Sequence, residues 1–218
     1  MLIGGIDEAG RGPAIGPMVM AIASIRKEDE FKLQSIGVKD SKLLSKKKRD
    51  ELYFIIKDIC RTAVIKISPE EVDEAVNSSS DNLNWLEART SAKLIKKVPS
   101  NQVVLDCPST NLSSYKEYIQ NRINNKKIKI IVEHKADLNH LIVGAASIIA
   151  KVERDREIEK IKEEIGKDFG SGYSSDPDTQ GFIERFWNHP EYSKFMRKSW
   201  DTWKKHHHQK SQKSLGEF

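Results

Sequence analysis

The chain has 218 residues, of which 38% are hydrophobic and 32% charged, and its formal net charge is +5. This composition excludes a disordered chain, and the length is sufficient to bury a proper core. No apolar run reaches the roughly 20 residues that span a bilayer, and the N-terminus lacks the features of a signal peptide. The two cysteines, Cys60 and Cys107, form no CxxC pair, so we expect a reducing, cytoplasmic setting with structural thiols. The modest positive charge permits a polyanionic partner without requiring one.

Strand-like and helix-like segments alternate along the chain. Strands are expected at residues 2–6, 18–24, 62–67, 102–105 and 127–133, the first two separated by a Gly/Pro-rich stretch. Helices are expected after the caps Ser45 and Ser68, at 83–97, 112–123 and 141–165, and in two stretches following Thr179. In the helix after Ser45, one face is expected to hold Leu52, Ile55, Ile56 and Ile59.

This alternation predicts a layered α/β domain with a largely parallel sheet and an opening hairpin. The small residues from Gly144 to Ser147 are expected to let the 141–165 helix pack tightly on the sheet. Most aromatic residues between Phe182 and Trp203 are expected to pack in a core, because they recur at helical spacing. The tail beyond Lys204 is expected to be detached from that core.

Four carboxylates follow or end strand-like segments. Asp7 and Glu8 end the first strand, Asp106 ends the strand at 102–105, and Asp137 follows the strand at 127–133. Each has an ordinary interpretation on its own: a solvated turn for Asp7 and Glu8, a turn before a proline for Asp106, and a helix cap for Asp137. Together they supply the hard oxygen ligands that suit magnesium or manganese in a site for phosphoryl transfer.

The strings around these acids resemble the ribonuclease HII family, most closely its archaeal branch. Four strings carry the resemblance in order: Asp7-Glu8-Ala9-Gly10-Arg11-Gly12-Pro13, Asp40-Ser41-Lys42-Leu43, Leu105-Asp106-Cys107-Pro108, and His134-Lys135-Ala136-Asp137 with Ala145-Ala146-Ser147-Ile148-Ile149-Ala150-Lys151-Val152 and Arg154-Asp155. The resemblance implies a ribonuclease H-like fold, a mixed five-stranded sheet flanked by helices, with a C-terminal helical region that helps to clamp a duplex.

The resemblance also implies an activity and a site. The expected enzyme is an endonuclease that hydrolyses the RNA strand of RNA-DNA hybrids and cuts 5′ of ribonucleotides embedded in duplex DNA, leaving 5′-phosphate and 3′-hydroxyl ends. Asp7, Glu8, Asp106 and Asp137 would be the catalytic residues and the ligands of Mg2+ or Mn2+. The substrate-binding residues would be Gly10, Arg11, Gly12, Lys42, Lys151, Arg154 and Tyr173.

The substrate-binding residues have separate expected roles. Gly10 and Gly12 let the backbone approach the 2′-hydroxyl closely, and Tyr173 packs on the neighbouring deoxyribose; an ordinary tight turn is the alternative. Lys42, Lys151 and Arg154 are expected to contact phosphates. If Asp137 and Lys151 shared one helix they would lie about 21 Å apart along its axis, so Lys151 is expected to serve a distant phosphate.

The C-terminal string Gln212-Lys213-Ser214-Leu215-Gly216-Glu217-Phe218 resembles the short peptide by which replication enzymes dock on the sliding clamp, PCNA. Gln212, Leu215 and Phe218 would be its anchors, although a second terminal aromatic residue is missing. The expected organisation is a catalytic domain at 1–175, a clamping region at 176–205 and a flexible tail at 206–218, in a monomer.

Two other functions remain open at this point. The first is a DNA-cutting nuclease of the same fold, which would need no reader of the 2′-hydroxyl. The second is a non-catalytic nucleic-acid adaptor that recruits the clamp, whose binding would depend steeply on salt but not on metal. A Walker-type nucleotide hydrolase is excluded, because the chain has no GxxxxGK[ST] string.

Overall fold

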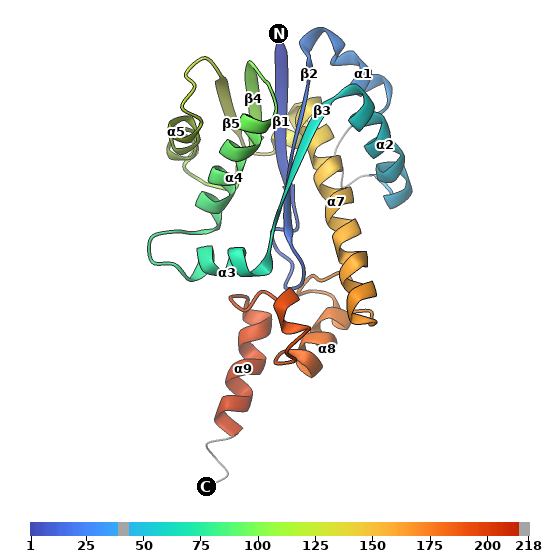
Figure 1. Ribbon diagram of the computed structural model, residues 1–218, viewed down its shortest axis with the longest axis vertical. Helices are drawn as coiled ribbons and strands as arrows, with labels where there is room; N and C mark the ends of the chain where they lie inside the picture. Colours follow the sequence, from blue (N-terminus) through green and yellow to red (C-terminus); the bar gives the residue numbers. More distant parts are fainter. Residues whose placement is uncertain (39–43, 214–218) are drawn as a thin grey trace. The chain divides into compact units, whose positions relative to one another are not determined.

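The computed structural model describes residues 1–38 and 44–213, with side chains described up to residue 207 (Figure 1). The chain divides into two compact units, each built from segments that are distant in sequence. The sheet unit comprises Met1–Ala9, Val19–Lys66 and Leu83–Glu153. The helical unit comprises Gly10–Met18, Ile67–Asn82 and Arg154–Phe218.

A five-stranded mixed sheet forms the centre of the sheet unit, in the order β3-β2-β1-β4-β5 (Figure 1). Its strands are β1 (Leu2–Ala9), β2 (Met18–Arg26), β3 (Arg61–Ile67), β4 (Gln102–Asp106) and β5 (Lys129–Glu133). Strands β1 and β2 pair antiparallel as a hairpin, whereas β1–β4 and β4–β5 pair parallel. The expected mixed sheet with an opening hairpin is therefore confirmed.

The helices include the two expected after the caps Ser45 and Ser68, whereas the helix expected after Thr179 begins at Pro177. They are α1 (Phe31–Ser35), α2 (Lys46–Ile59), α3 (Pro69–Asn77), α4 (Leu83–Lys97), α5 (Leu112–Ile123), α6 (Ala136–Asn139), α7 (Leu141–Ile165), α8 (Pro177–Phe186) and α9 (Asp201–Lys213), with 3-10 turns at Lys27–Asp29 and Ser193–Phe195. The Ser45 side chain accepts from the backbone N–H of Lys48, and Ser68 forms a capping box with Glu71. One expected core residue is wrong: Ile55 of α2 is 41% exposed, while Leu52 and Ile56 are buried.

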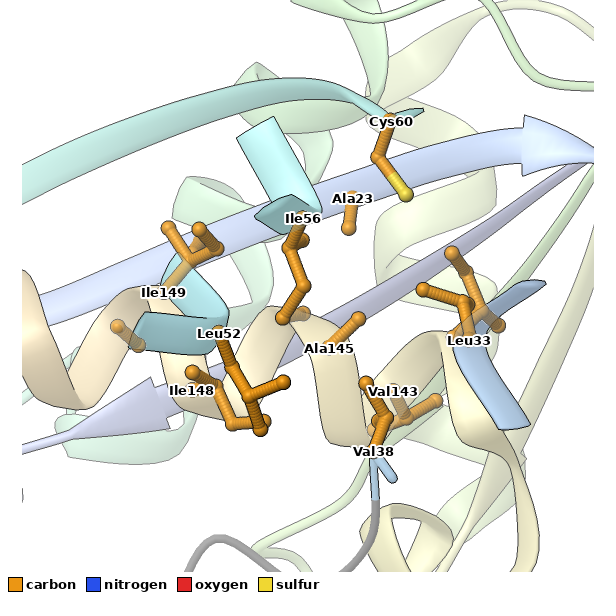
Figure 2. Packing of buried hydrophobic residues seen from close by; sticks show 14 of the residues in the cluster. Ala23, Leu33, Val38, Leu52, Ile56, Cys60, Val143, Ala145, Ile148 and Ile149 are labelled. Carbon is orange, nitrogen blue, oxygen red and sulfur yellow. The ribbon is translucent and has the colours of Figure 1, made fainter. Parts of the chain in front are cut away.

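Helix α7 packs closely on the sheet through small residues. A Cβ atom on Gly5 of β1 would lie 2.4 Å from the backbone carbonyl of Ile142, so only glycine permits this approach. Ala145 and Ala146 are fully buried, as the run of small residues predicted. Figure 2 shows Leu52 and Ile56 of α2 beside α7 within the same core. This packing fixes the position of α7, which carries Ser147 and Lys151.

The helical unit has a separate core rich in aromatic side chains. Its fully buried members include Ile15, Phe169 and Ile183, and Phe182 lies 5.6 Å from Phe169 between ring centroids. The other aromatic residues from the C-terminal region pack against this cluster: Phe186, Trp187, Tyr192, Phe195, Trp200 and Trp203. The expectation that these aromatic residues form a core is confirmed, and each large apolar side chain that is fully buried contributes about 1.5–3 kcal/mol.

Part of the C-terminal segment, which was expected to be a flexible tail from residue 206, is helical. Helix α9 continues to Lys213, so residues 206–213 are helical, and residues 214–218 lie outside the described part of the chain. Elsewhere, too, a short helix was not foreseen: α6 is separated from α7 by His140, whose backbone is extended. None of the helices among the described residues is long and apolar enough to cross a membrane.

Candidate active site

Asp7 and Asp106 lie at the same level on neighbouring parallel strands. The register pairs Ile6 of β1 with Leu105 of β4, so the next residues along the two strands are Asp7 and Asp106. Neighbouring strands are about 4.8 Å apart, which brings the two backbones close at this edge of the sheet. Asp7 is buried with 6% of its surface exposed, while Glu8, the next residue of β1, is partly exposed.

Asp137 joins this edge through the start of α6. The backbone N–H of Ala136 donates to Oδ1 of Asp106 at 3.0 Å, so the carboxylate that ends β4 anchors the first residue of α6. Asp137 follows directly and is 7% exposed. A left-handed backbone at Lys135, with φ of 57°, turns the chain from β5 into this helix. The two acids that lie 31 positions apart in sequence are therefore neighbours in the fold.

The electrostatics of Asp7 show how close the carboxylates are. Burial raises the pKa of Asp7 well above its usual range, and the charges of Glu8 and, more weakly, Asp106 raise it further. Hydrogen bonds from the Ser147 hydroxyl and from the N–H of Glu8, the latter at 2.9 Å, act in the opposite direction. Three carboxylates thus repel one another around a buried position, and a bound cation would relieve that repulsion.

These residues fit a divalent metal ion by their chemistry. Carboxylate oxygens are the ligands that Mg2+ and Mn2+ prefer, and the raised pKa of Asp7 indicates a position where positive charge stabilises the ionised form. Within residues 1–38 and 44–213, no three His, Cys, Asp or Glu side chains already converge into a metal-binding group. The case for a metal ion therefore rests on the carboxylate oxygens that are present and on their mutual repulsion, not on a set of ligands already arranged around one point.

Sequence reasoning missed several polar residues near the acids. Glu87 of α4 is 1% exposed, and its charge and that of Glu8 both raise the pKa of the buried Tyr115 hydroxyl, after burial itself. The same two carboxylates contribute to raising the pKa of Cys107, after burial and Asp106. A signal was present, since Glu87, Thr90 and Ser91 interrupt the apolar residues of the buried face of this helix. Ser147 was given only a packing role, yet its hydroxyl bonds Asp7.

The distance expected between Lys151 and the metal centre rested on an assumption that is wrong. It assumed one helix from Asp137 to Lys151, whereas the chain breaks at His140 between α6 and α7. Ser147 bonds Asp7, and Lys151 lies one helical turn further along α7, about 6 Å along the axis. No continuous helix therefore separates Lys151 from Asp137.

The turn that follows Asp7 and Glu8 belongs to the helical unit and is held by buried side chains. Gly10 has φ of 79°, and a Cβ there would lie 2.7 Å from the carbonyl of Pro17. Gly12 differs, because a Cβ there would meet no protein atom within 4 Å. Arg11, between them, is partly exposed. The protein itself thus explains the glycine at position 10 but not the glycine at position 12.

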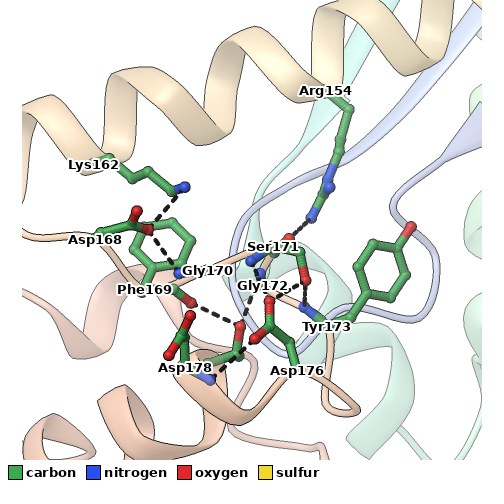
Figure 3. Close-up of polar contacts among 11 residues, drawn as sticks. Arg154, Lys162, Asp168, Phe169, Gly170, Ser171, Gly172, Tyr173, Asp176 and Asp178 are labelled. Carbon is green, nitrogen blue, oxygen red and sulfur yellow. Dashed lines mark hydrogen bonds and ion pairs between the residues drawn. The ribbon is translucent and has the colours of Figure 1, made fainter. Parts of the chain in front are cut away.

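Tyr173 lies in a loop whose backbone is fixed by hydrogen bonds (Figure 3). Asp176 accepts from the N–H and the hydroxyl of Ser171, both at 2.7 Å, and Thr179 accepts from the N–H of Gly172 at 3.0 Å. In turn, the Thr179 hydroxyl donates to the carbonyl of Phe169. The carbonyl of Gly172 accepts from the N–H groups of Ala14 and Ile15, which ties this loop to the segment that follows Gly10–Gly12.

Arg154, for which a phosphate contact was expected, is buried in the structure. Its side chain is 3% exposed, and its guanidinium donates to the carbonyl of Ser171 at 2.8 Å and lies 5.0 Å from the Tyr173 ring centroid. A buried guanidinium cannot reach a phosphate in solution without losing these contacts. The structure instead gives Arg154 the function of supporting the Tyr173 loop (Figure 3).

Some expected site residues cannot be placed. Lys42 lies outside the described residues, as does the rest of the Asp40–Leu43 string. The same holds for Leu215 and Phe218, and only the backbone of Gln212, in α9, is described.

The fold and the strand-edge acids define the class as a nuclease of the ribonuclease H-like fold. The crystal structure of ribonuclease H2 from Pyrococcus horikoshii OT3 is similar to this chain, with a TM-score of 0.86 and 37% sequence identity. The match covers 96% of this chain and 98% of the chain in that structure. The ribonuclease HII family model matches residues 4–203, and this chain belongs to that family. It is an endoribonuclease that cleaves RNA in RNA-DNA hybrids and ribonucleotides embedded in DNA.

Other relatives support the same assignment. Ribonuclease HII of Methanococcus maripaludis (strain C6 / ATCC BAA-1332) is 47% identical over 206 residues, which are 92% of this chain and 85% of the relative. A structure of the PCNA:RNase HII complex from Archaeoglobus fulgidus has a TM-score of 0.83 at 39% identity, covering 92% of this chain and 96% of its counterpart. A Bst-RNase HIII solved in complex with Mn2+ is 22% identical, with a TM-score of 0.78, and shows the fold alone. The archaeal resemblance and the metal-dependent ribonuclease H class are confirmed.

Proposed function

We propose that Asp7, Glu8, Asp106 and Asp137 are the catalytic residues of this ribonuclease and hold Mg2+ or Mn2+. The observation that carries the assignment is the buried carboxyl of Asp7, whose pKa is raised by burial and by Glu8 and Asp106. Burying a carboxyl group beside two other carboxylates costs free energy, and groups with such perturbed pKa values cluster at functional sites. These four acids would hold the metal ion, which when bound would provide activation of a water and neutralisation of charge on the leaving oxygen.

The residues around the acids fix the direction of each carboxylate. Asp7 is held by the Ser147 hydroxyl and the N–H of Glu8, and Asp106 by the N–H of Ala136. Both N–H donors belong to the backbone of β1 or α6, so the acids are preorganised by regular structure rather than by mobile loops. The cleavage proposed for these acids is the one that the family resemblance implies, on the 5′ side of the ribonucleotide with 5′-phosphate and 3′-hydroxyl ends.

Recognition of the ribose falls to Gly10, Arg11, Gly12 and Tyr173. The open space over the Cα of Gly12 supports this function, because a sugar that approaches the backbone closely would fill it. Phosphate binding falls to Lys42 and Lys151, and residues 176–205 would help to hold the duplex beyond the reacting nucleotide.

The test of the catalytic assignment is cleavage of a labelled DNA duplex that contains one ribonucleotide, with Mg2+ or Mn2+ and with chelator. The wild type is expected to cut 5′ of the ribonucleotide only with metal, and Asp7→Asn to lose the cut. Asp58→Asn is the matched control, since Asp58 is an exposed carboxylate on α2. Binding without cleavage under every metal condition would instead indicate the non-catalytic adaptor, and equal cutting of an all-DNA junction would indicate a DNA nuclease.

The C-terminal string supports a second interaction, docking on the sliding clamp through Gln212, Leu215 and Phe218. A related archaeal enzyme has been solved as a complex with PCNA, and this chain carries the glutamine, aliphatic and aromatic residues of a docking peptide. The Leu215→Ala/Phe218→Ala variant is expected to lose binding to PCNA while cleavage of a short duplex stays unchanged, and Ser214→Ala serves as control. Retention of PCNA affinity in the double variant would remove the tail from this interaction.

A further inference from the structure

Arg197 is a buried cation whose described hydrogen bonds all end on backbone carbonyls of one short segment. Its side chain is 0% exposed, and its guanidinium donates to the carbonyls of Gly10 at 2.5 Å, Arg11 at 2.6 Å and Gly16 at 3.1 Å. Burying a guanidinium is costly unless its N–H groups are satisfied, and the planar fork of arginine can satisfy several acceptors at once. Burial, and secondarily the charge of Arg154, lowers the pKa of Arg197 to about 10, so it remains charged at neutral pH.

Trp200 completes this set of donors. Its indole N–H donates to the carbonyl of Gly12 at 2.9 Å, and its ring lies 5.0 Å from the Arg197 guanidinium. The carbonyls of three consecutive residues, Gly10, Arg11 and Gly12, are therefore all held by two side chains three positions apart.

The segment that carries these donors is itself fixed by α3. The carboxylate of Asp73 accepts from the backbone N–H of Lys198 at 2.7 Å, from the N–H of Ser199 at 2.9 Å and from the Ser199 hydroxyl. The N–H of Arg197 donates to the carbonyl of Ala14 at 2.8 Å, and Ile15 pairs with Met196 as an isolated bridge. These contacts hold the backbone of residues 197–200, and with it Arg197 and Trp200, in place.

Holding the carbonyls determines where the amides point. A trans peptide is planar, with C=O and the following N–H on opposite sides, and no cis peptide bond occurs among the described residues. Fixing the carbonyls of Gly10 and Arg11 toward Arg197 therefore directs the N–H groups of Arg11 and Gly12 away from Arg197. Next to these N–H groups, a Cβ on Gly12 would meet no protein atom within 4 Å.

We propose that Arg197 and Trp200 are positioning residues for ribose recognition. Arg197 sets the orientation of the Arg11 and Gly12 amides, and Trp200 fixes the peptide between Gly12 and Pro13, which has no N–H, and so restricts rotation of the Gly12 backbone. The proposal rests on the proposed function of the Gly10–Gly12 turn as the ribose reader. Arg197, which is fully buried, and Trp200 would then influence the preference of the enzyme for RNA through the backbone of the turn.

The test compares two tryptophans of the same region. Trp200→Phe removes the donor to Gly12, whereas Trp203→Phe removes an equivalent indole bond, 3.0 Å to the carbonyl of Trp187, that does not touch the turn. Each variant is assayed with Mg2+ on a duplex containing one ribonucleotide, and an all-DNA duplex of the same sequence is added as competitor. The ratio of the competitor's Ki to the substrate's KM measures the preference for RNA, and it does not depend on the fraction of folded enzyme.

Trp200→Phe is expected to lower this ratio about fivefold, the effect of one lost hydrogen bond, and Trp203→Phe to leave it unchanged. Arg197→Lys keeps the positive charge but loses the planar guanidinium, whose N–H groups bond several carbonyls at once, and is expected to lower the ratio further. A wild-type ratio above one that stays the same in Trp200→Phe and Arg197→Lys would overturn the positioning role and leave the proposed reader intact. A wild-type ratio of one that Gly12→Ala does not change would instead contradict the reader itself.

Discussion

Gly10 and Gly12 stand in the same turn, but different constraints act on them. Gly10 needs a positive φ and the close carbonyl of Pro17, whereas Gly12 has neither constraint from the protein. At this scale the structure separates a glycine that the fold requires from one that the substrate would require.

The pair gives a direct prediction. Gly12→Ala is expected to leave the free energy of unfolding unchanged or raised by about 0.4–1 kcal/mol, because alanine restricts the unfolded chain, while cleavage at a ribonucleotide falls steeply. Gly10→Ala is expected to destabilise the fold by at least about 1–2 kcal/mol through backbone strain and the Pro17 contact. Urea unfolding and cleavage assays on both variants measure this, and full activity in a stable Gly12→Ala protein would count against substrate contact there.

Asp7 provides a second prediction, on stability without metal. Because folding raises the pKa of Asp7, the folded protein holds this proton more tightly than the unfolded chain, whose aspartates titrate near about 3.9. The free energy of unfolding contributed by Asp7 therefore falls as pH rises from that value through the pKa of the folded state.

Asp7→Asn is thus expected to raise the Tm of metal-free protein at neutral pH, by about 2–4 °C for each kcal/mol relieved, and to lose cleavage. The gain should shrink as pH falls toward 4, where the wild-type carboxyl is protonated. Thermal unfolding in chelator at several pH values provides the measurement, and a variant that is less stable than wild type at neutral pH would contradict the repulsion described for these acids.

At the scale of elements, the loop between α7 and α8 depends on Asp176. Hydrogen bonds from the Ser171 hydroxyl, first, and from the Ser171 N–H lower the pKa of this carboxyl, which also caps α8 through the N–H of Asp178. A lowered pKa means that the stabilisation is present above the pKa of the unfolded chain and is lost as pH falls through the pKa of the folded state.

Asp176→Asn is therefore expected to be less stable than wild type at neutral pH, and the two proteins should converge below about pH 4. The same change should increase hydrogen exchange at Ser171 and Tyr173, because one amide cannot accept all the bonds of a carboxylate. A stability difference that persists unchanged at acid pH would show that the carboxylate charge is not the cause.

The elements also show how far sequence patterns reach. The caps Ser45 and Ser68 and the 141–165 helix could be predicted because capping and periodicity depend on residues within a few positions. The break at His140 could not, since α6 is held by Asp106, 30 positions before Ala136. Strand-edge acids were predictable from strand ends, but the bond of Ser147 to Asp7 depends on how α7 packs.

For the turn proposed to read the ribose, the sequence and its family resemblance identified the glycines and Tyr173 but not Arg197 or Trp200. Those two residues act on carbonyls more than 180 positions earlier, and carbonyls are common to all residue types. The burial of Arg154 was not foreseen for a related reason, since a basic residue on a helix gives no indication that its guanidinium lies buried against Ser171.

At the scale of the whole molecule, the net charge of +5 suits a nucleic-acid substrate. The logarithm of the binding constant for a duplex is expected to fall linearly with the logarithm of the salt concentration. The slope is about −0.9 for each phosphate contacted. Lys151→Ala should reduce the slope by about one such step, and Arg154→Ala should not, because Arg154 is buried. Fluorescence anisotropy at several salt concentrations measures both, and equal reductions would return Arg154 to the phosphate-binding residues.

The separation of Arg197 from Gly10 along the chain also affects synthesis on the ribosome. All four candidate catalytic acids lie within the first 137 residues, whereas Arg197, the side chain that holds the Gly10–Gly12 turn, is added near the end. A nascent chain that has emerged through α7 would therefore carry its acids before it can discriminate RNA from DNA. Translation stalled before residue 197 is expected to give a chain without ordered ribose recognition, so selectivity is acquired last.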